Sequence, residues 1–514
     1  MKYVVTAAEM QSADQYTSEK LGLPSMVLME RAALAVADEI CRRFAPLRGK
    51  IRTRVCIACG SGNNGGDGFA LGRILNERGF SVHFFMAEEA RHVSEANGIQ
   101  RKILENLGLA VSTGQPIDEY DIIVDALFGT GLHREITGAY RRLIERLNGM
   151  TGYKVAVDIP SGIHADDGSV LGCAFFADLT VTFAFEKWGQ LLYPGKEYCK
   201  ETICADIGIP EVSLCERPPF GRRLTAGDMP DCIPPRKNDS HKGTYKKAGV
   251  IAGSKQMGGA AILCGKAAMK TGVGYTKIIT EQSNREPLLT VLPEALLYLY
   301  QTDNLPMEQL ADCSAIAVGP GIGTDREGEA LLEGALETYD ASLVVDADAV
   351  NLLAQRDDLK EALKRYVKKA EKKGNVVVLT PHKKEFSRLT GISMDEGPAQ
   401  WHKTALETAK AYGAVLVLKD AATRVYTPEG TVYVNTTGNP GMSTAGSGDV
   451  LTGILCGLLA QAKEKTLAVA AGVYLHGQCG DYAAKTGNPY AMTAADLADA
   501  LNYVLKGAAK DETL

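Results

Sequence analysis

A glycine-rich turn near the end of the chain carries the clearest signal for chemistry. Residues 436–456 read TTGNPGMSTAGSGDVLTGILC, a loop dense in glycine and serine that leads into an apolar helix beginning near Asp449. Backbone N–H groups at a helix N-terminus bind anions, and glycine lets phosphate approach the backbone closely. Asp449 would suit such a site if it accepts a proton from a hydroxyl that attacks phosphorus. The turn predicts phosphoryl transfer, and the competing interpretation is a simple helix N-cap.

Four other segments of the second half place polar or glycine-rich turns directly after apolar strands. Ligands of open α/β sheets bind at the carboxyl ends of the strands. His382 and Lys419 are therefore candidates for ligand contact, Lys419 with a phosphate or an adenine. The segments are VGPGIGTD (318–325), VVDADAVN (344–351), LTPHKKEF (379–386) and VLKDAAT (417–423).

The first half has its own glycine-rich loop, GSGNNGGDG at 60–68, between the apolar run VCIAC and the helix pattern FALGRILNERG. A strand, a glycine loop and a helix in this order suit a dinucleotide phosphate site, although the match to the usual fingerprint is weak. Asparagine tolerates left-handed backbone angles, so a bare turn is the alternative.

Two more turns of the first half, VDALFGTGLHRE (124–135) and VDIPSGIHADDG (157–168), set Asp125 and Asp158 at the ends of apolar strands. Asn64, Asp125 and Ser161 offer only oxygen ligands, which suit a hard cation and not zinc. Asp158 could abstract or relay a proton, or could equally be an N-cap.

Composition limits the class of protein. A chain of 514 residues exceeds one hydrophobic core, so two or more domains are expected. The net charge is −6 without a sustained basic stripe, which argues against nucleic acid or an anionic membrane as partner. Neither a membrane-spanning apolar run nor a signal-peptide core is expected. The twelve scattered cysteines include one C-x-x-C, Cys56 and Cys59, which is interpreted as part of a buried strand. A reducing, cytoplasmic location is expected.

Apolar strands alternate with amphipathic helices in both halves, which predicts parallel sheets covered on both faces. A segment rich in proline, glycine and charge, 208–245, separates the halves and predicts a domain boundary near 212–223. In the first half, strands are predicted at 54–59, 82–86, 121–126, 153–158, 179–185 and 202–206, and helices at 7–21, 24–44, 69–78, 95–107 and 138–147.

In the second half, two short runs flank Pro428-Glu429-Gly430 and predict a hairpin at an antiparallel edge. Predicted strands are 249–252, 275–280, 315–318, 343–345, 376–379, 415–418, 423–427 and 431–435. Predicted helices are 260–271, 326–337, 384–389, 398–412 and 449–460.

The motifs from about 224 to 507 resemble the ribokinase-like superfamily, specifically the ADP- or ATP-dependent dehydratases of hydrated NAD(P)H. HKGTYKKAGVIAGS, GGAAILCGKAAMKTGVG, GPGIG, DADAVN, LTPHKKEF and NPGMSTAGSGDVLTGI match in order. The resemblance implies substrate contacts from Ala260, Gly323, His382 and Asp449, with Asp449 catalytic. It implies that the adenine nucleotide is held by Lys419, Asp420, Ala421, Ala422, Thr423 and Gly448. The family usually has glycine where this chain has Asp420, and like-charge repulsion there would weaken nucleotide binding.

Residues 6–213 resemble the NAD(P)HX epimerase family through GSGNNGGDG, VDALFGTGL and DIPSG. The resemblance implies an acid/base role for Asp158 and K⁺ ligation by Asn64, Asp125 and Ser161. The implied substrate contacts are Asn63, Asn64, Gly65, Gly66, Asp67, Gly129, Thr130, Gly131, Leu132, His133, Arg134, Glu135 and Asp158.

Together the two resemblances imply one bifunctional α/β enzyme that repairs hydrated NAD(P)H. They imply a Rossmann-like three-layer epimerase domain at 1–217 and a ribokinase-like, ADP-dependent dehydratase domain at 224–514. K⁺, Mg²⁺ and ADP are the implied cofactors, NAD(P)HX and ADP or AMP the partners, and a homo-oligomer is expected. The rival hypothesis is a ribokinase-like small-molecule kinase with a non-catalytic N-terminal binding domain.

Overall fold

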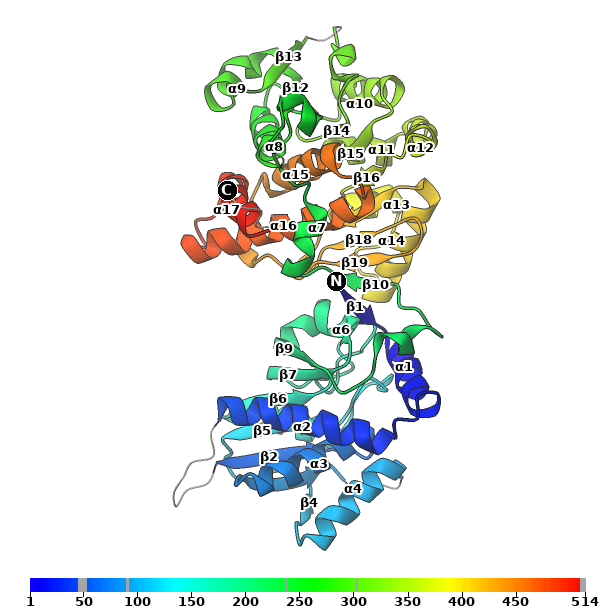
Figure 1. Cartoon of the computed structure of the whole chain (residues 1–514), viewed down its shortest axis with the longest axis vertical. Coiled ribbons are helices and arrows are strands. Elements are labelled where there is room, and N and C mark those ends of the chain that lie inside the picture. The colour runs from blue at the N-terminus through cyan, green and yellow to red at the C-terminus, as the bar shows by residue number, and fades with distance from the viewer. Residues whose placement is uncertain (45–52, 89–91, 237, 302–303, 509–514) are drawn as a thin grey trace. The chain divides into compact units, whose positions relative to one another are not determined.

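The structure is a computed structural model that describes residues 1–44, 53–88, 92–236, 238–301 and 304–508. The chain divides into two compact units, shown with their elements in Figure 1. The first unit is Tyr3–Gly221, and the second is Met1–Lys2 with Arg222–Leu514. Both units contain parallel β-sheet with helices, so the predicted α/β class with two units is confirmed.

The first unit is built on a seven-stranded sheet in the order β4-β3-β2-β5-β6-β7-β9, in which every neighbouring pair is parallel. The short β1 and β8 pair with each other in parallel and are not strands of this seven-stranded sheet. The strands are β1 (Lys2–Val5), β2 (Arg54–Cys59), β3 (Ser81–Met86), β4 (Val111–Thr113), β5 (Ile122–Ala126), β6 (Tyr153–Val157), β7 (Ala177–Phe183), β8 (Glu186–Lys187) and β9 (Cys199–Ala205). The helices are α1 (Ala7–Glu19), α2 (Ser25–Arg43), α3 (Asn63–Glu77), α4 (Glu95–Asn106), α5 (Gly138–Gly149) and α6 (Trp188–Leu191).

Alternate side chains of β2 pack into two different hydrophobic clusters, one on each face of the sheet. Val55 and Ile57 pack in the cluster that includes α2 and α3, whereas Cys56 and Ala58 pack in the cluster that includes α5. Side chains of a strand point alternately to opposite faces, so a strand covered on both faces must be apolar throughout. This accounts for VCIAC and confirms that Cys56 and Cys59 are buried strand residues.

The glycine-rich loop of the first half is a helix for most of its length, which corrects the predicted helix start at Phe69. Helix α3 begins at Asn63, after Gly62. Glycine normally weakens a helix interior, but here close packing requires it. A β-carbon on Gly66 would lie 2.8 Å from Cε of Met29, and one on Gly65 would lie 1.9 Å from the carbonyl oxygen of Gly60.

The second unit is built on a sheet with the order β13-β12-β11-β14-β15-β16-β17-β18-β19. Pairs from β13 to β17 are parallel, and β17-β18 and β18-β19 are antiparallel, so the predicted hairpin edge is confirmed. The strands are β11 (Lys247–Ile251), β12 (Tyr275–Glu281), β13 (Leu296–Tyr300), β14 (Ala315–Val318), β15 (Ser342–Val345), β16 (Val377–Leu379), β17 (Val415–Leu418), β18 (Arg424–Tyr426) and β19 (Val432–Val434), with the short β10 (Gly221–Arg223) at the boundary of the units.

Helices α8 and α15 pack on this sheet in one core, while α16 and α17 extend a second core beside α15. The helices are α7 (Met229–Cys232), α8 (Gly258–Lys270), α9 (Arg285–Val291), α10 (Arg326–Thr338), α11 (Ala347–Gln355), α12 (Asp357–Glu371), α13 (Lys383–Thr390), α14 (Pro398–Tyr412), α15 (Ser447–Gln461), α16 (Lys465–Thr486) and α17 (Ala494–Ala508). The sequence did not predict β13, α16 or α17. Helix α16 buries side chains around much of its circumference and lacks the amphipathic stripe that marks a surface helix.

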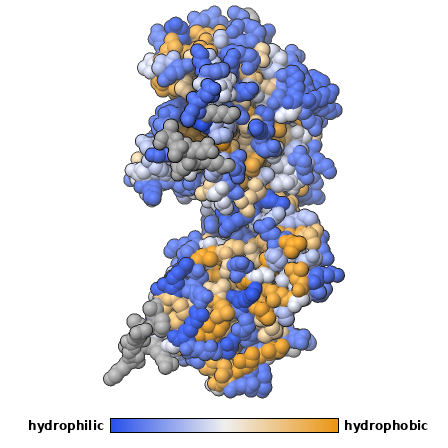
Figure 2. All heavy atoms as spheres, viewed as in Figure 1, coloured by the Kyte–Doolittle hydropathy of each residue, from blue (hydrophilic) through white to orange (hydrophobic). Residues whose placement is uncertain are grey.

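Figure 2 shows hydrophilic side chains over much of the visible face, with hydrophobic side chains gathered over part of the first unit. Val27 and Leu34 of α2 and Ile99 of α4 are among the exposed large hydrophobic residues. Within the described ranges, no helix combines the length and apolar character needed to cross a bilayer.

Candidate active sites

The first candidate site lies at the N-terminus of α15 in the second unit. Gly446 precedes the helix in the left-handed conformation, with φ of +88°, where a β-carbon would also lie 2.5 Å from Cδ1 of Leu263. Glycine is therefore required twice at this position, for its backbone angles and for space. Asp449 sits in the first turn, where N–H groups have no partner within the helix.

A network of ionic and hydroxyl contacts lies beside this turn. The carboxylate of Asp346, which follows β15, is 1% exposed. Its Oδ1 lies 2.7 Å from Nζ of Lys419 and accepts a hydrogen bond from the Thr380 hydroxyl at 2.8 Å. Its Oδ2 accepts one from the Thr452 hydroxyl of α15 at 2.7 Å. The buried negative charge is thus paired and hydrogen-bonded, as burial requires.

Asp449 has a different electrostatic environment. Burial raises the pKa of its carboxyl, the charges of Asp346 and Asp348 raise it further, and Lys419 lowers it; the result is about 7. A carboxyl with a pKa near the working pH can accept a proton and still be regenerated readily. Asp449 therefore has the properties of a general base.

The structure links several of the sequence-predicted residues of this half to the groups that act on Asp449 or to the turns that carry them. A β-carbon on Gly448 would lie 3.4 Å from Nζ of Lys419, which places the glycine beside the ammonium group. The N–H of Gly323 donates to Oδ2 of Asp348 at 2.9 Å. Ala260 packs close to Gly321 of the same glycine-rich turn.

His382 and Lys419 follow adjacent strands, β16 and β17, and are joined by a backbone bridge. His382 caps α13: its Nδ1 accepts a hydrogen bond from the N–H of Glu385 at 3.1 Å. Its side chain remains 49% exposed, so the cap and a contact with a ligand are compatible.

The segment from Lys419 to Thr423 forms a compact turn. The Thr423 hydroxyl donates to the carbonyl oxygen of Asp420 at 2.9 Å and accepts from its N–H at 3.3 Å. The Asp420 carboxylate pairs with Lys383 at 2.7 Å. The extra negative charge expected to repel a nucleotide thus has a cation next to it. Of the two alanines in this turn, Ala421 is exposed and Ala422 is buried.

Several residues of this site were not predicted. They include Asp346, Glu385 and His476, a half-buried histidine whose pKa is lowered to about 4 mainly because its surroundings desolvate the charged form. His476 Nε2 lies 3.4 Å from the Ser447 hydroxyl. The strand-end motif VVDADAVN already pointed to Asp346, but nothing in the local sequence marks His476, which reaches the site from α16.

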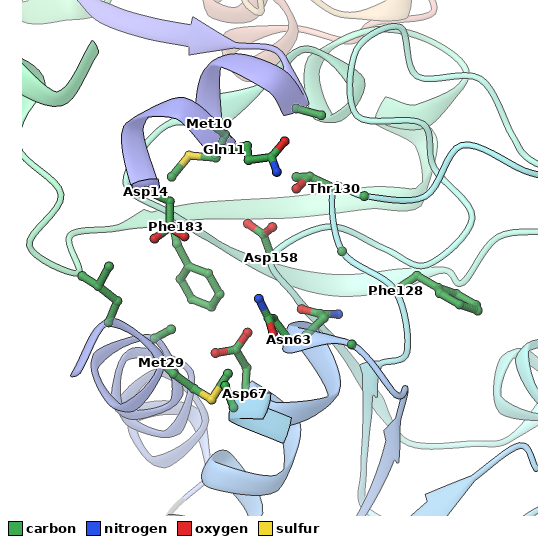
Figure 3. Close-up of a pocket in the computed structure, with 18 of the residues that line it drawn as sticks. Met10, Gln11, Asp14, Met29, Asn63, Asp67, Phe128, Thr130, Asp158 and Phe183 are labelled. Atoms are coloured by element: carbon green, nitrogen blue, oxygen red, sulfur yellow. The ribbon is translucent and has the colours of Figure 1, made fainter. Parts of the chain in front are cut away.

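The second candidate site is a cavity of about 1100 Å³ in the first unit, shown in Figure 3. Its wall includes residues from α1, α2, α3 and the turns after β5 and β6. The predicted contact residues that line it are Asn63, Asn64, Asp67, Gly129, Thr130, Gly131, Leu132, His133, Arg134 and Asp158. Three others do not: Gly65 and Gly66 face the packing interior of α3, and the exposed Glu135 lies outside the lining.

Neighbouring segments fix the loop that enters α3. The side-chain amide of Asn97, from α4, donates to the carbonyl oxygens of Gly60 at 3.0 Å and Gly62 at 2.9 Å. The N–H of Gly60 donates to the carbonyl oxygen of Ala126 at the end of β5. These bonds hold the start of α3 against the strand end that carries Asp125.

Asp158 follows β6 in a left-handed conformation, with φ of +66°, which is uncommon outside glycine. Its Oδ1 accepts hydrogen bonds from Nζ of Lys187 at 2.5 Å and from the Thr182 hydroxyl at 3.1 Å. Lys187 is 1% exposed and also donates to the Phe183 carbonyl oxygen at 3.2 Å. The sequence did not predict Lys187, because only the fold brings β8 to the turn after β6.

Asp125, Ser161 and Asn64 form an oxygen-rich corner. Asp125 is fully buried, and its carboxylate accepts from the N–H and the hydroxyl of Ser161, both at 2.7 Å. Burial raises its pKa to about 6, against the lowering effect of those hydrogen bonds. The Asn64 side chain packs against Gly129 next to this pair. Within the part of the chain that the structure describes, no Lys or Arg pairs with Asp125, so a bound monovalent cation would fit the chemistry of the corner.

Two family models match the chain, one in each half. Residues 248–502 match the family model for NAD(P)H-hydrate dehydratase, and residues 25–189 match the model for the YjeF-related protein N-terminus. The chain is also similar to a solved protein, the ADP/ATP-dependent NAD(P)H-hydrate dehydratase from Bacillus subtilis, which was co-crystallized with ATP/Mg²⁺. The two sequences are 32% identical, and the match covers 55% of this chain and 97% of that chain, with a TM-score of 0.48.

Relatives that match along the whole chain carry one description. The bifunctional NAD(P)H-hydrate repair enzyme Nnr of Thermofilum pendens is 36% identical over 99% of this chain and 97% of its own length. The enzymes of the same description from Moorella thermoacetica and Escherichia coli are 38% and 31% identical, over 98% of this chain in both cases and over 97% and 94% of their own lengths. The chain therefore belongs to the family of bifunctional NAD(P)H-hydrate repair enzymes, with an epimerase half followed by a dehydratase half.

Proposed function

We propose that the chain interconverts R- and S-NAD(P)HX in its first half and dehydrates S-NAD(P)HX to NAD(P)H in its second half, with ADP as phosphoryl donor and AMP and phosphate as products. The epimerase domain is 1–217 and the dehydratase domain 224–514. The observation that carries the proposal is Asp449, a carboxyl with a pKa of about 7 in the first turn of a helix whose Gly448 lies beside the ammonium group of Lys419.

The dehydratase must solve a leaving-group problem, because hydroxide leaves carbon poorly. Asp449 takes the proton of the substrate hydroxyl while its oxygen attacks the terminal phosphoryl group of ADP, and AMP departs. The N–H groups at the start of α15 and the ammonium of Lys419 stabilise the charge on the phosphoryl oxygens. Phosphate then leaves with the help of the ring nitrogen lone pair, and loss of a ring proton restores the double bond of NAD(P)H.

We propose the following roles for the other residues of the second half. Ala260, Gly323, His382 and Asp449 contact the hydrated nicotinamide nucleotide. The adenine nucleotide is held by Lys419, Asp420, Ala421, Ala422, Thr423 and Gly448. Mg²⁺ would supply charge neutralisation on the nucleotide. The described residues contain no group of three or more His, Cys, Asp or Glu side chains that could hold a metal, so its ligands would be mainly phosphate oxygens and water.

The epimerase half uses Asp158 as its acid/base group and binds the substrate in the cavity of Figure 3. Asn64, Asp125 and Ser161 would hold K⁺, which would supply a positive charge next to the buried Asp125 and help to fix the turns after β5 and β6. The proposed contacts with substrate come from Asn63–Asp67, Gly129–Glu135 and Asp158. Gly65, Gly66 and Glu135 do not line the cavity, so their contacts rest on the family resemblance alone.

A cytoplasmic location and a homo-oligomer complete the proposal. Within the described residues no disulfide bond joins two cysteines, which suits a reducing compartment. Exposed apolar side chains on α2 and α4, including Val27, Leu34 and Ile99, would be covered in a homo-oligomer.

The test is incubation of the full chain with a mixture of NADHX epimers and ADP or ATP, followed by chromatography of all products. Formation of NADH, phosphate and AMP from ADP is expected. A kinase would instead accumulate a stable phosphorylated product, and a first half that only binds would leave the R epimer unchanged.

A further inference from the structure

Asp67 is a carboxyl group of the first-unit cavity for which the proposed chemistry has no use beyond substrate contact. It projects from α3 into the cavity that also contains Asp158 and Asp14, with Met29 close to it (Figure 3). Among the described residues, no hydrogen bond or ion pair engages the Asp67 carboxyl. A polar group in this position is available to a ligand that enters the cavity.

Asp67 and Asp158 share one cavity but have opposite electrostatic surroundings. Asp158 accepts hydrogen bonds from the Lys187 ammonium and the Thr182 hydroxyl, so its negative charge is stabilised. Asp67 faces carboxylates: burial raises its pKa well above the usual range, and Asp158 and Asp14 raise it further. A carboxylate held by a cation next to a carboxyl that lacks one is the arrangement of a base and an acid.

The proposed reaction requires such a pair. Water that adds across a nitrogen-substituted double bond places its hydroxyl on the carbon bonded to nitrogen, which makes a hemiaminal. To invert that carbon by ring opening, a base removes the hydroxyl proton, the carbonyl forms, and the carbon–nitrogen bond breaks with its electrons moving to nitrogen. Nitrogen then takes a proton from an acid. Rotation and reclosure reverse both transfers, so no co-reactant is consumed.

We propose that Asp67 is a catalytic residue of the epimerase site that donates a proton to the ring nitrogen while Asp158, held by Lys187, accepts the hydroxyl proton. Lys187 is the positioning residue of the pair. The assignment deepens the proposed epimerase function and rests on it. Once the ring recloses on the other face, Asp67 recovers its proton from nitrogen and Asp158 returns its own to oxygen.

The test uses Asp67→Asn in the full chain, which keeps the shape but cannot donate an acidic proton. Conversion of R-NADHX to the S epimer is followed by chromatography without ADP. We expect kcat to fall by about 100-fold or more with KM little changed, since that is the usual contribution of general acid catalysis. Dehydration of the S epimer with ADP, at the other site, should be unchanged and reports on folding.

The matched control is Asp118→Asn, the same substitution at a carboxyl that is 55% exposed and outside the cavity, which should epimerise as the wild type does. Wild-type kcat/KM for epimerisation should fall on the alkaline side as Asp67 ionises. Asp14→Asn should shift that decline to lower pH, because it removes a negative charge that raises the pKa of Asp67. If Asp67→Asn impairs both activities, the variant is misfolded. The pH profiles of the wild type and of Asp14→Asn then decide whether Asp67 is the proton donor.

The outcomes distinguish a failure of the Asp67 assignment from a failure of the proposed epimerase function. Epimerisation by Asp67→Asn at a rate near that of the wild type would overturn the role of Asp67 and leave the epimerase function intact, and a rise in KM alone would reduce Asp67 to a binding residue. An alkaline limb that does not move in Asp14→Asn would also count against the assignment. Absence of epimerisation in the wild type would overturn the proposed function itself.

Discussion

The ammonium group of Lys419 lies 2.7 Å from Oδ1 of Asp346, and both groups act on the carboxyl of Asp449. Asp346 is also bonded to Thr380 and Thr452, so its charge is compensated on both oxygens. Asp449 has no such pairing among the described residues. In this arrangement the Asp346 carboxylate holds the lysine, and the Asp449 carboxyl stays unpaired among the described residues.

Replacement of Asp449 by asparagine tests the base directly. Asp449→Asn should lower ADP-dependent recovery of reduced-nicotinamide absorbance from S-NADHX by about 100-fold or more, because the amide cannot accept the hydroxyl proton. Epimerisation of R-NADHX by the same chain serves as the control and should persist. Retained recovery would remove Asp449 from the base role.

The pH dependence of dehydration follows from the raised pKa of Asp449. The base must be ionised, so kcat/KM for S-NADHX should rise with pH through about 7. Asp348→Asn should move this rise to lower pH, because the Asp348 charge raises the pKa of Asp449. A kcat/KM that stays constant from about two pH units below 7 to about two pH units above it would contradict the assignment.

Asp420 and Lys383 form a partly exposed ion pair that should tune nucleotide affinity. Lys383→Met should raise the KM for ADP, because it leaves the Asp420 carboxylate without its cation near the phosphates. Asp420→Gly should lower it. Pairs of this exposure are worth about 0.2–1 kcal/mol, so changes of about two- to fivefold are expected. Initial rates of dehydration against ADP concentration measure the effect, and equal KM values in the two variants would show that neither charge meets the nucleotide.

Asp158→Asn should have the converse effect to Asp449→Asn. Conversion of the R epimer should fall by about 100-fold or more, and ADP-dependent dehydration of the S epimer should be spared, since the two carboxyls belong to different units. Chromatography of single-epimer reactions separates the two effects. Normal conversion of the R epimer would exclude Asp158 as the acid/base group.

The oxygen-rich corner at Asp125 predicts a dependence on K⁺. Replacing K⁺ in the buffer by a bulky organic cation at equal ionic strength should slow epimerisation and lower the thermal midpoint of the first unit. Asp125→Ala should make both properties insensitive to K⁺. The dehydratase rate, measured with S-NADHX in the same buffers, is the control. An equal response of the variant and the wild type to K⁺ would place the ion elsewhere.

Local sequence was informative where function depends on a strand end or a helix start. Strand β2 and the hairpin β18-β19 were predicted because their patterns are short-range. Asp449 was selected as a candidate because glycine and aspartate at a helix start suggest a phosphate site. The start of α3 was misplaced because its glycines serve packing against Met29 and Gly60, which the sequence shows only as a loop.

Residues that reach a site from another element were not predictable in this way. Lys187 is brought to Asp158 by the path of the chain after β7, and His476 comes to Ser447 from α16. Neither has a distinctive local motif, and a buried lysine cannot be told from an exposed one by its neighbours in sequence. Their partners depend on tertiary packing.

The most direct test of the account is recovery of reduced-nicotinamide absorbance from pure R-NADHX by the wild-type chain with ADP. Both proposed activities are required in sequence, so absorbance should be recovered fully, and an equal mixture of Asp158→Asn and Asp449→Asn chains should restore it by exchanging the free S epimer. Recovery from S-NADHX without recovery from R-NADHX above the uncatalysed rate would contradict the bifunctional account.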